Sequence, residues 1–184
     1  MAYNKSKSKG SAYERHVANQ FGKWWCGSEL ALFRNSGSGN RHIAEVYSGD
    51  LAPSSDFAKP WPLSVEVKKA ENWSVDGFIK GNPSEPLLAY MVQTLGCAKM
   101  GCNQVPLLVC TKNFQKPLIF LSTECRKYVR SSALKHFTWY ICRLKWQKEI
   151  PQKLQKQYNW NGEIDFICIT LGQFFSTFRR ENFL

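Results

Sequence analysis

The first strong pattern along the chain is helical and runs from Gly10 to Cys26. Apolar side chains recur at helical spacing and fall within one arc of about 120°; they are Tyr13, Val17, Phe21, Trp24 and Trp25. Polar side chains fill the opposite side of the same helix. Glu14 breaks the pattern, because its angle lies between those of Phe21 and Trp25. We therefore expect the Glu14 carboxylate to point toward the protein.

Short apolar and β-branched runs after this helix predict a sheet. The expected strands are 30–34, 43–51, 63–69, 105–111, 117–121, 137–144 and 164–170. A second helix is predicted from Ser84, as its N-cap, to Gly101 just past its end. Shorter helices are expected at 122–135 and 173–180. This alternation predicts an α/β fold, with a central mixed β-sheet flanked by helices.

The chain has the length and apolar content of one ordinary domain. It has 184 residues, of which 43% are hydrophobic, and this is enough to bury a core. The first nine residues alternate Lys, Ser and Asn, which predicts a basic flexible tail. We therefore expect a tail at 1–9 and a single domain at 10–184, with its core at about 10–121 and C-terminal additions at 122–184.

Charge narrows the choice of partner. Twenty-five Lys and Arg against 14 Asp and Glu give a formal net charge of +11, which favours a polyanion such as DNA. Anionic membrane is the alternative, but no apolar run approaches the roughly 20 residues of a membrane span. The seven cysteines lack the spacing of a disulfide framework, which predicts a reducing, cytoplasmic and DNA-associated location. A zinc site at Cys97 and Cys102 is also conceivable, although both lie where a thiol acts as a small apolar group.

The most informative segment is the predicted strand that contains Glu66 and Lys68. Alternate residues of a strand share a face, so Val65 and Val67 would enter the core while Glu66 and Lys68 point the other way together. Burial of such a pair costs hydration free energy, so we expect the two charges to have further partners or a chemical task. Phosphodiester hydrolysis is one such task, since Mg²⁺ prefers carboxylate oxygens and an ammonium can orient water. A plain ion pair is the other interpretation.

A second carboxylate is expected from the segment upstream of this strand. Asp50 follows Gly49 at the end of a predicted strand, so it could share a cation with Glu66. Asp56 competes for this role, but it lies in a segment that resembles a loop. The sequence favours Asp50 and leaves Asp56 open.

Together these residues resemble the PD-(D/E)XK nuclease superfamily, most closely its Holliday-junction-resolvase-like branch. Glu14, Gly49-Asp50 and Glu66-x-Lys68 stand at the family's motif positions, over about residues 10–112. Arg34 and Ser36-Gly37 match an Arg and a Ser-Gly that such resolvases carry between the helix and the Asp. The resemblance implies a restriction-endonuclease-like core and a metal-dependent endonuclease.

The resemblance also implies roles for these residues. Asp50, Glu66 and the Val67 carbonyl would hold Mg²⁺, which Mn²⁺ could replace, with Glu14 acting directly or through water. Lys68 would position the attacking water and stabilise developing charge. Gln93, on the second helix, is a weaker candidate, because its angle also fits a residue that faces solvent.

DNA is the expected partner, and a homodimer is expected because one active site addresses one phosphodiester. Besides a basic stretch at 145–156, the residues expected to contact the DNA backbone are Lys5, Lys7, Lys9, Arg34, Ser36 and Arg41. A junction resolvase acting in DNA recombination competes with a site-specific homing or restriction-like endonuclease. A non-catalytic DNA-binding protein on a nuclease fold is the third possibility.

Overall fold

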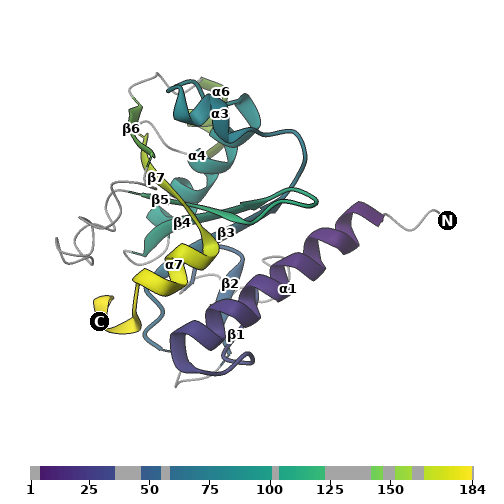
Figure 1. The fold of residues 1–184 in the computed structure, drawn as a ribbon, viewed down its shortest axis with the longest axis vertical. Coiled ribbons are helices and arrows are strands. Elements are labelled where there is room, and N and C mark those ends of the chain that lie inside the picture. Colours follow the sequence, from purple (N-terminus) through teal and green to yellow (C-terminus); the bar gives the residue numbers. More distant parts are fainter. Residues whose placement is uncertain are drawn as a thin grey trace.

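The computed structural model describes residues 5–35, 47–54, 59–100, 104–122, 142–146, 152–158 and 164–183. Within this part of the chain, a β-sheet lies between two groups of helices (Figure 1). The chain therefore has the layered α/β arrangement that the sequence predicted.

The main sheet has five strands in the order β3-β4-β5-β7-β6. They are β3 (Leu63–Lys69), β4 (Val105–Thr111), β5 (Leu118–Ser122), β6 (Cys142–Trp146) and β7 (Ile164–Thr170). β3 and β4 are parallel, whereas every other neighbouring pair is antiparallel. The sheet is thus mixed, and the predicted fold class is confirmed, including its likeness to a restriction-endonuclease core.

Helices cover both faces of the sheet (Figure 1). One face carries α1 (Lys5–Cys26) and α7 (Leu171–Thr177), with the short η3 (Arg180–Asn182) at the end of the described chain. The other face carries α3 (Val75–Ile79), α4 (Glu85–Met100) and α6 (Gln152–Tyr158). Two separate apolar cores result, one on each side of the sheet.

Alternation along β3 divides its side chains between these two sides. Val65 and Val67 join the core beneath α1, where Phe21 is completely buried. Glu66 and Lys68 consequently turn toward α4, which packs against β3 and β4. The predicted orientation of this pair is therefore what the fold shows.

A two-stranded ribbon lies beside the edge of this sheet. β1 (Leu32–Arg34) pairs antiparallel with β2 (Leu51–Pro53). Just before β2, Gly49 forms an isolated parallel bridge to Val65 of β3. Because β3 is the edge strand of the main sheet, residue 50 is brought against a strand side that no other strand of the described chain covers.

Several boundaries differ from the prediction. α1 begins at Lys5, so residues 5–9 are helical where a flexible tail was expected; their Lys and Ser residues carry no apolar stripe that would have signalled a helix. β2 starts at Leu51, whereas the predicted strand ended there, and residues 43–46 of that prediction lie outside the described residues. β6 is shifted to Cys142–Trp146, and the predicted helix at 122–135 lies, beyond residue 122, outside the described chain.

Two helices were not predicted. α3 is only five residues long, and Ser74 caps it by accepting a hydrogen bond from the Asp76 N–H at 3.2 Å. α6 lies in the basic stretch that the sequence suggested was exposed, and Leu154 is its buried apolar contact. Each helix has five to seven residues and a single buried one, which is too short a segment to show a periodicity. No helix within the described ranges is both long and apolar enough to span a membrane.

Candidate active site

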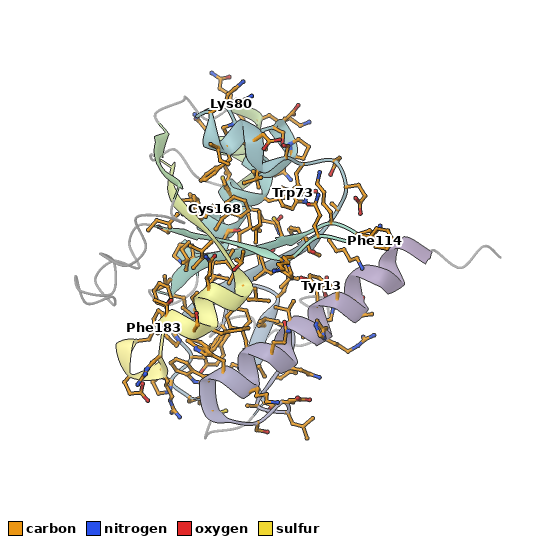
Figure 2. The ribbon with its side chains drawn as sticks, in the orientation of Figure 1. Tyr13, Trp73, Lys80, Phe114, Cys168 and Phe183 are labelled. Atoms are coloured by element: carbon orange, nitrogen blue, oxygen red, sulfur yellow. The ribbon has the colours of Figure 1, made fainter. Side chains whose placement is uncertain are left out.

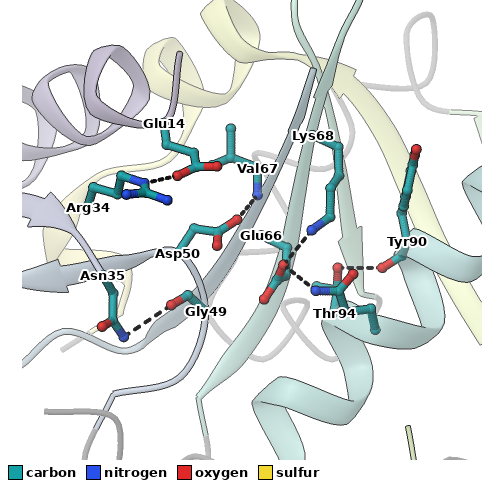
Figure 3. A network of polar contacts seen from close by, with 11 residues as sticks. Glu14, Arg34, Asn35, Gly49, Asp50, Glu66, Val67, Lys68, Tyr90 and Thr94 are labelled. Carbon is teal, nitrogen blue, oxygen red and sulfur yellow. Dashed lines mark hydrogen bonds and ion pairs between the residues drawn. The ribbon is translucent and has the colours of Figure 1, made fainter. Parts of the chain in front are cut away.

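The centre of the site is the Glu66–Lys68 pair on β3 (Figure 3). The Lys68 Nζ lies 3.0 Å from the Glu66 Oε2, and the two side chains are 21% and 4% exposed. The Lys68 ammonium also lies 5.9 Å from the centre of the Tyr90 ring. Burial lowers the pKa of Lys68, but the charges of Glu66 and Asp50 outweigh burial and leave this pKa above its ordinary value. Lys68 is therefore a cation at neutral pH.

Helix α4 supplies two further contacts to Glu66. Gln93 donates a hydrogen bond from Nε2 to the Glu66 Oε2 at 2.9 Å. Cys97, one turn later on the same side of the helix, lies close enough that burial and then the Glu66 charge raise the pKa of its thiol to about 12. The sequence favoured a solvent-facing Gln93 over a position near the metal site, and that interpretation is wrong. The reason is that β3 turns its polar face toward α4, so the side of the helix that carries Gln93 is covered as well.

Asp50 reaches the site from the segment that precedes β2. Its backbone N–H donates to the Val65 carbonyl at 2.6 Å, and its Oδ2 accepts a hydrogen bond from the Val67 N–H at 2.8 Å. Gly49 makes this approach possible, because its φ is 89° and a Cβ there would lie 2.6 Å from the Val65 oxygen. Only glycine fits such a position without strain. The Gly-Asp order predicted from the sequence thus has a steric cause.

Polar side chains that the sequence analysis did not identify hold this segment in place. Asn35 donates from Nδ2 to the carbonyls of Tyr47 and Gly49, at 3.3 and 3.2 Å. The buried Ser48 hydroxyl lies 2.8 Å from both the Ser64 hydroxyl and the Gln104 Oε1. Gln104 in turn donates to the carbonyl of Trp61, which precedes β3, and to that of Leu63 at the start of β3. Each contact joins residues far apart in the chain, so no local pattern signals it.

The carboxylates of Asp50 and Glu66 repel each other electrostatically. Burial, together with the charges of Glu66 and Glu14, raises the pKa of Asp50 to about 7, even though Lys68 and the Val67 N–H act in the opposite direction. Ionisation of Asp50 beside the Glu66 charge at neutral pH therefore costs folding free energy. A bound cation would remove that cost.

This repulsion predicts an unusual stability profile for Asp50→Asn. The ordinary pKa of Asp is near 3.8, and in the folded protein it is about 7. Between these values the folded protein binds more protons than the unfolded chain, so Asp50 lowers the free energy of unfolding as pH rises. In EDTA, Asp50→Asn should therefore be more stable than wild type above about pH 7, on the order of a few kcal/mol. Urea unfolding of both proteins between about pH 4 and pH 8 checks this, and a stability difference independent of pH would contradict it.

Glu14 forms an ion pair with Arg34. The Glu14 side chain is 17% exposed and that of Arg34 is 32% exposed. Glu14 points inward as predicted, and its charge is felt at Asp50. Its ion-pair partner, Arg34, was not predicted from the sequence. Arg34, expected on the DNA backbone, thus has an internal partner as well.

The remaining candidates fall outside what the structure describes. Ser36, Arg41 and Asp56 lie in undescribed segments, so the choice between Asp50 and Asp56 depends on the placement of Asp50 alone. Lys5, Lys7 and Lys9 lie on α1, but their side chains are not described. Their role in DNA binding stays a prediction.

The donors present fit a hard divalent cation. Among the described residues, no group of three or more His, Cys, Asp and Glu side chains is placed to hold a metal ion, so a site must combine two carboxylates with backbone. The N–H and C=O of one strand residue point to the same side. Since the Val67 N–H points to Asp50, its carbonyl oxygen is on that side too. Carboxylate and carbonyl oxygens are ligands that Mg²⁺ accepts.

A strand carrying Glu-x-Lys, beside an Asp that follows glycine, defines the class of PD-(D/E)XK nucleases. The chain belongs to one family of that class, described as "Phage putative PDDEXK endonuclease", whose family model matches residues 5–183. Comparison with curated proteins gives no match, and comparison with solved structures gives none. The match extends over the C-terminal additions, which the resemblance inferred from the sequence did not reach.

Proposed function

We propose that the protein is a Mg²⁺-dependent DNA endonuclease whose active site comprises Asp50, Glu66 and Lys68. The observation that carries this proposal is the convergence of the three side chains on the edge strand β3. The Lys68 Nζ lies 3.0 Å from the Glu66 Oε2. Val67, the residue between Glu66 and Lys68, donates its backbone N–H to the Asp50 carboxylate. Nothing in the apolar packing of β3 requires these charges, so a chemical task is the better explanation.

Asp50, Glu66 and the Val67 carbonyl would hold the Mg²⁺. When bound, this ion would polarise the phosphate and lower the pKa of a water ligand. Lys68 stays protonated, because its pKa lies above the ordinary value. Lys68 therefore acts as a hydrogen-bond donor and a positive charge, orienting water and stabilising the charge of the transition state rather than taking a proton.

Gln93 acts as a positioning residue in this proposal. Its amide and the Lys68 ammonium both donate to the Oε2 of Glu66. Two donors on one oxygen fix the rotation of the carboxylate, which a metal site requires of its ligands. We propose the same supporting role for Asn35, which holds the carbonyl of Gly49 directly before Asp50.

A Mg²⁺-dependent cleavage assay tests the proposed function. Four-way junction, linear duplex and single-stranded DNA are offered side by side, with and without EDTA. Cleavage of at least one DNA that requires the divalent cation is expected. The absence of cleavage with Mg²⁺ and with Mn²⁺, for a folded protein that binds DNA, would favour the non-catalytic alternative.

The same assay separates the possible substrates. Preference for the junction would support a resolvase in DNA recombination, and discrete cuts in linear duplex would support a homing or restriction-like endonuclease. The net charge of +11 suits either substrate, because phosphate contacts carry no sequence information. A homodimer would allow two cuts, one from each active site, and stays a prediction.

Replacement of Glu14 by Gln should reduce cleavage but hardly affect folding. Cleavage should fall because Glu14 contributes negative charge beside Asp50. There it would bind the metal ion either directly or through a water molecule. Higher Mg²⁺ or Mn²⁺ should restore part of the activity. Stability should fall by no more than about 1 kcal/mol, since Arg34 is one-third exposed and can be hydrated.

The matched control for this prediction is Glu29→Gln. Glu29 forms a comparable ion pair with Lys23 at 3.6 Å, but it is 59% exposed. Cleavage rates over a Mg²⁺ titration and melting temperatures are measured for both variants. Normal cleavage in Glu14→Gln together with a large drop in melting temperature would give Glu14 a structural role only.

A further inference from the structure

The turn that joins β4 to β5 carries an unusually exposed aromatic residue. Phe114 has a relative exposure of 107%, compared with 82% for Leu30 and 46% for Ile79, the other exposed large apolar side chains of the described residues. Figure 2 shows Phe114 at the outer end of this hairpin. Its ring therefore adds nothing to the apolar core.

The backbone at this position is also unfavourable for Phe. Phe114 has a φ of 61°, the one positive φ at a non-glycine residue within the described ranges. Gly or Asn adopts this region readily, but a bulky side chain is strained there. A strained, fully exposed aromatic residue lowers stability without any return from packing, and such residues occur preferentially at functional sites.

Contacts on both sides of Phe114 keep the turn in one shape. The Asn113 N–H donates to the Glu71 carboxylate at 2.9 Å, and the Thr111 hydroxyl donates to the Gln115 carbonyl at 3.3 Å. The Lys112 ammonium lies 5.4 Å from the centre of the buried Trp73 ring. The Phe114 ring is thus presented on an ordered support, which limits the entropy lost when it binds something.

The turn lies close to the active site. In the parallel pair of β3 and β4, Lys68 is opposite Cys110 and Lys69 is opposite Thr111. Phe114 is three residues past Thr111, so it lies at most about 11 Å beyond the end of β4. Glu66 is opposite Leu108, three residues before Thr111, so Phe114 lies at most about 22 Å along the strand from the level of Glu66, or about six base-pair steps along DNA. α1 borders the same region, because the Lys69 ammonium lies 5.6 Å from the centre of the Tyr13 ring.

Charge indicates what the ring would meet. Lys112 and Lys116 flank Phe114 in sequence, and Lys69 is exposed at the neighbouring strand end. Cations around an exposed aromatic ring suit a base with its adjoining phosphates, because stacking and phosphate contact act together. An apolar protein surface would instead leave these ammonium groups without water or counter-charge.

We propose that Phe114 stacks on a base of the DNA substrate, or enters between two neighbouring bases, within about six nucleotides of the cleaved bond. Lys112 and Lys116 contact the phosphates on either side. The inference rests on the proposed function, because it takes DNA to be the substrate. It adds a residue that unstacks the DNA near the cut, a task separate from metal binding.

Binding of fluorescently labelled duplex, without divalent cation, tests the inference. Phe114→Ala should weaken binding by about fivefold to a hundredfold, the range for loss of one base–aromatic stack. Phe114→Trp should bind like wild type. Phe114→Asn should melt at a higher temperature than wild type and still bind weakly, because Asn relieves the backbone but cannot stack. Ile79→Ala, which removes an exposed apolar side chain on α3, is the matched control and should change neither quantity.

A second readout locates the contact. 2-Aminopurine placed at successive positions around the mapped cut should brighten when wild type binds, because its stacking is broken. The signal should be largest within about six steps of the cut and absent with Phe114→Ala. Equal binding by Phe114→Ala and wild type, together with equal 2-aminopurine signals, would overturn the inference while leaving the nuclease intact. Failure of wild type itself to bind any DNA would overturn the proposed function and this inference together.

Discussion

Replacement of Glu66 by Gln should lower the rate of DNA cleavage by about a thousandfold or more, while DNA binding stays within a few-fold of wild type. The Glu66 carboxylate is 4% exposed and receives hydrogen bonds from Lys68 and Gln93, so its geometry does not depend on DNA. Gln keeps the shape of the side chain but removes the charge that a metal ion requires. The loss therefore falls on the transition state, and phosphate contacts elsewhere keep the DNA bound.

Asp50→Asn should behave in the same way, and surface carboxylates provide the control. Asp76→Asn, on the exposed side of α3, should cleave at the wild-type rate. Single-turnover cleavage and DNA-binding titrations are measured for all three variants. Wild-type cleavage by Glu66→Gln would refute the assignment of the site. An active Asp50→Asn together with an inactive Asp56→Asn would change only the identity of the metal-binding Asp.

Sequence patterns could predict strand β3 because the alternation of its side chains is local. Val65 and Val67 alternate with Glu66 and Lys68, and this alternation alone assigns the charges to one face. Glycine before Asp50 also carried information, since a positive φ and a close approach to Val65 leave little choice of residue. The alternation in residues 65–68 and the order of glycine and Asp at 49–50 are local patterns, so they could be recognised in the sequence.

The surroundings of the site could not be predicted, because they depend on how distant elements meet. Gln93 contacts Glu66 across 27 residues, and Ser48 contacts Gln104 across 56. The helical angle of Gln93 lies away from the predicted apolar stripe of α4, and by the usual rule such a residue would face water. Gln93 is instead covered because it lies opposite the polar side of β3, which carries Glu66. The partner of Glu14 was missed for the same reason, since Arg34 lies on a different element.

The location of the site at the edge of the sheet follows from this arrangement. A strand with partners on both sides would have its backbone groups occupied by hydrogen bonds. β3 instead has β4 on one side and the short segment at Gly49 and Asp50 on the other. The Val67 N–H is thereby available to Asp50, and the Val67 carbonyl is available to a cation.

Replacement of Lys68 by Met should have two large effects, one on stability and one on catalysis. The Lys68 ammonium is the cation paired with the nearly buried Glu66 carboxylate. Removing one partner of a buried ion pair typically lowers the free energy of unfolding by about 3–5 kcal/mol. In EDTA we therefore expect a clear fall in the urea midpoint of Lys68→Met. Cleavage should drop by at least about a hundredfold even at saturating Mg²⁺, because the donor that orients water and stabilises charge is gone.

A double mutant and a neighbouring lysine make this prediction specific. Combining Lys68→Met with Glu66→Gln removes both charges, so most of the lost stability should return, while cleavage stays absent. Mg²⁺ should stabilise Lys68→Met, in which Asp50 and Glu66 remain, more than it stabilises the double mutant. Lys69→Met is the control, since Lys69 is exposed on the same strand but faces Tyr13, and its urea midpoint should match that of wild type. If Lys68→Met unfolds at the wild-type urea concentration and cleaves normally, Lys68 is neither the partner of Glu66 in solution nor a member of the active site.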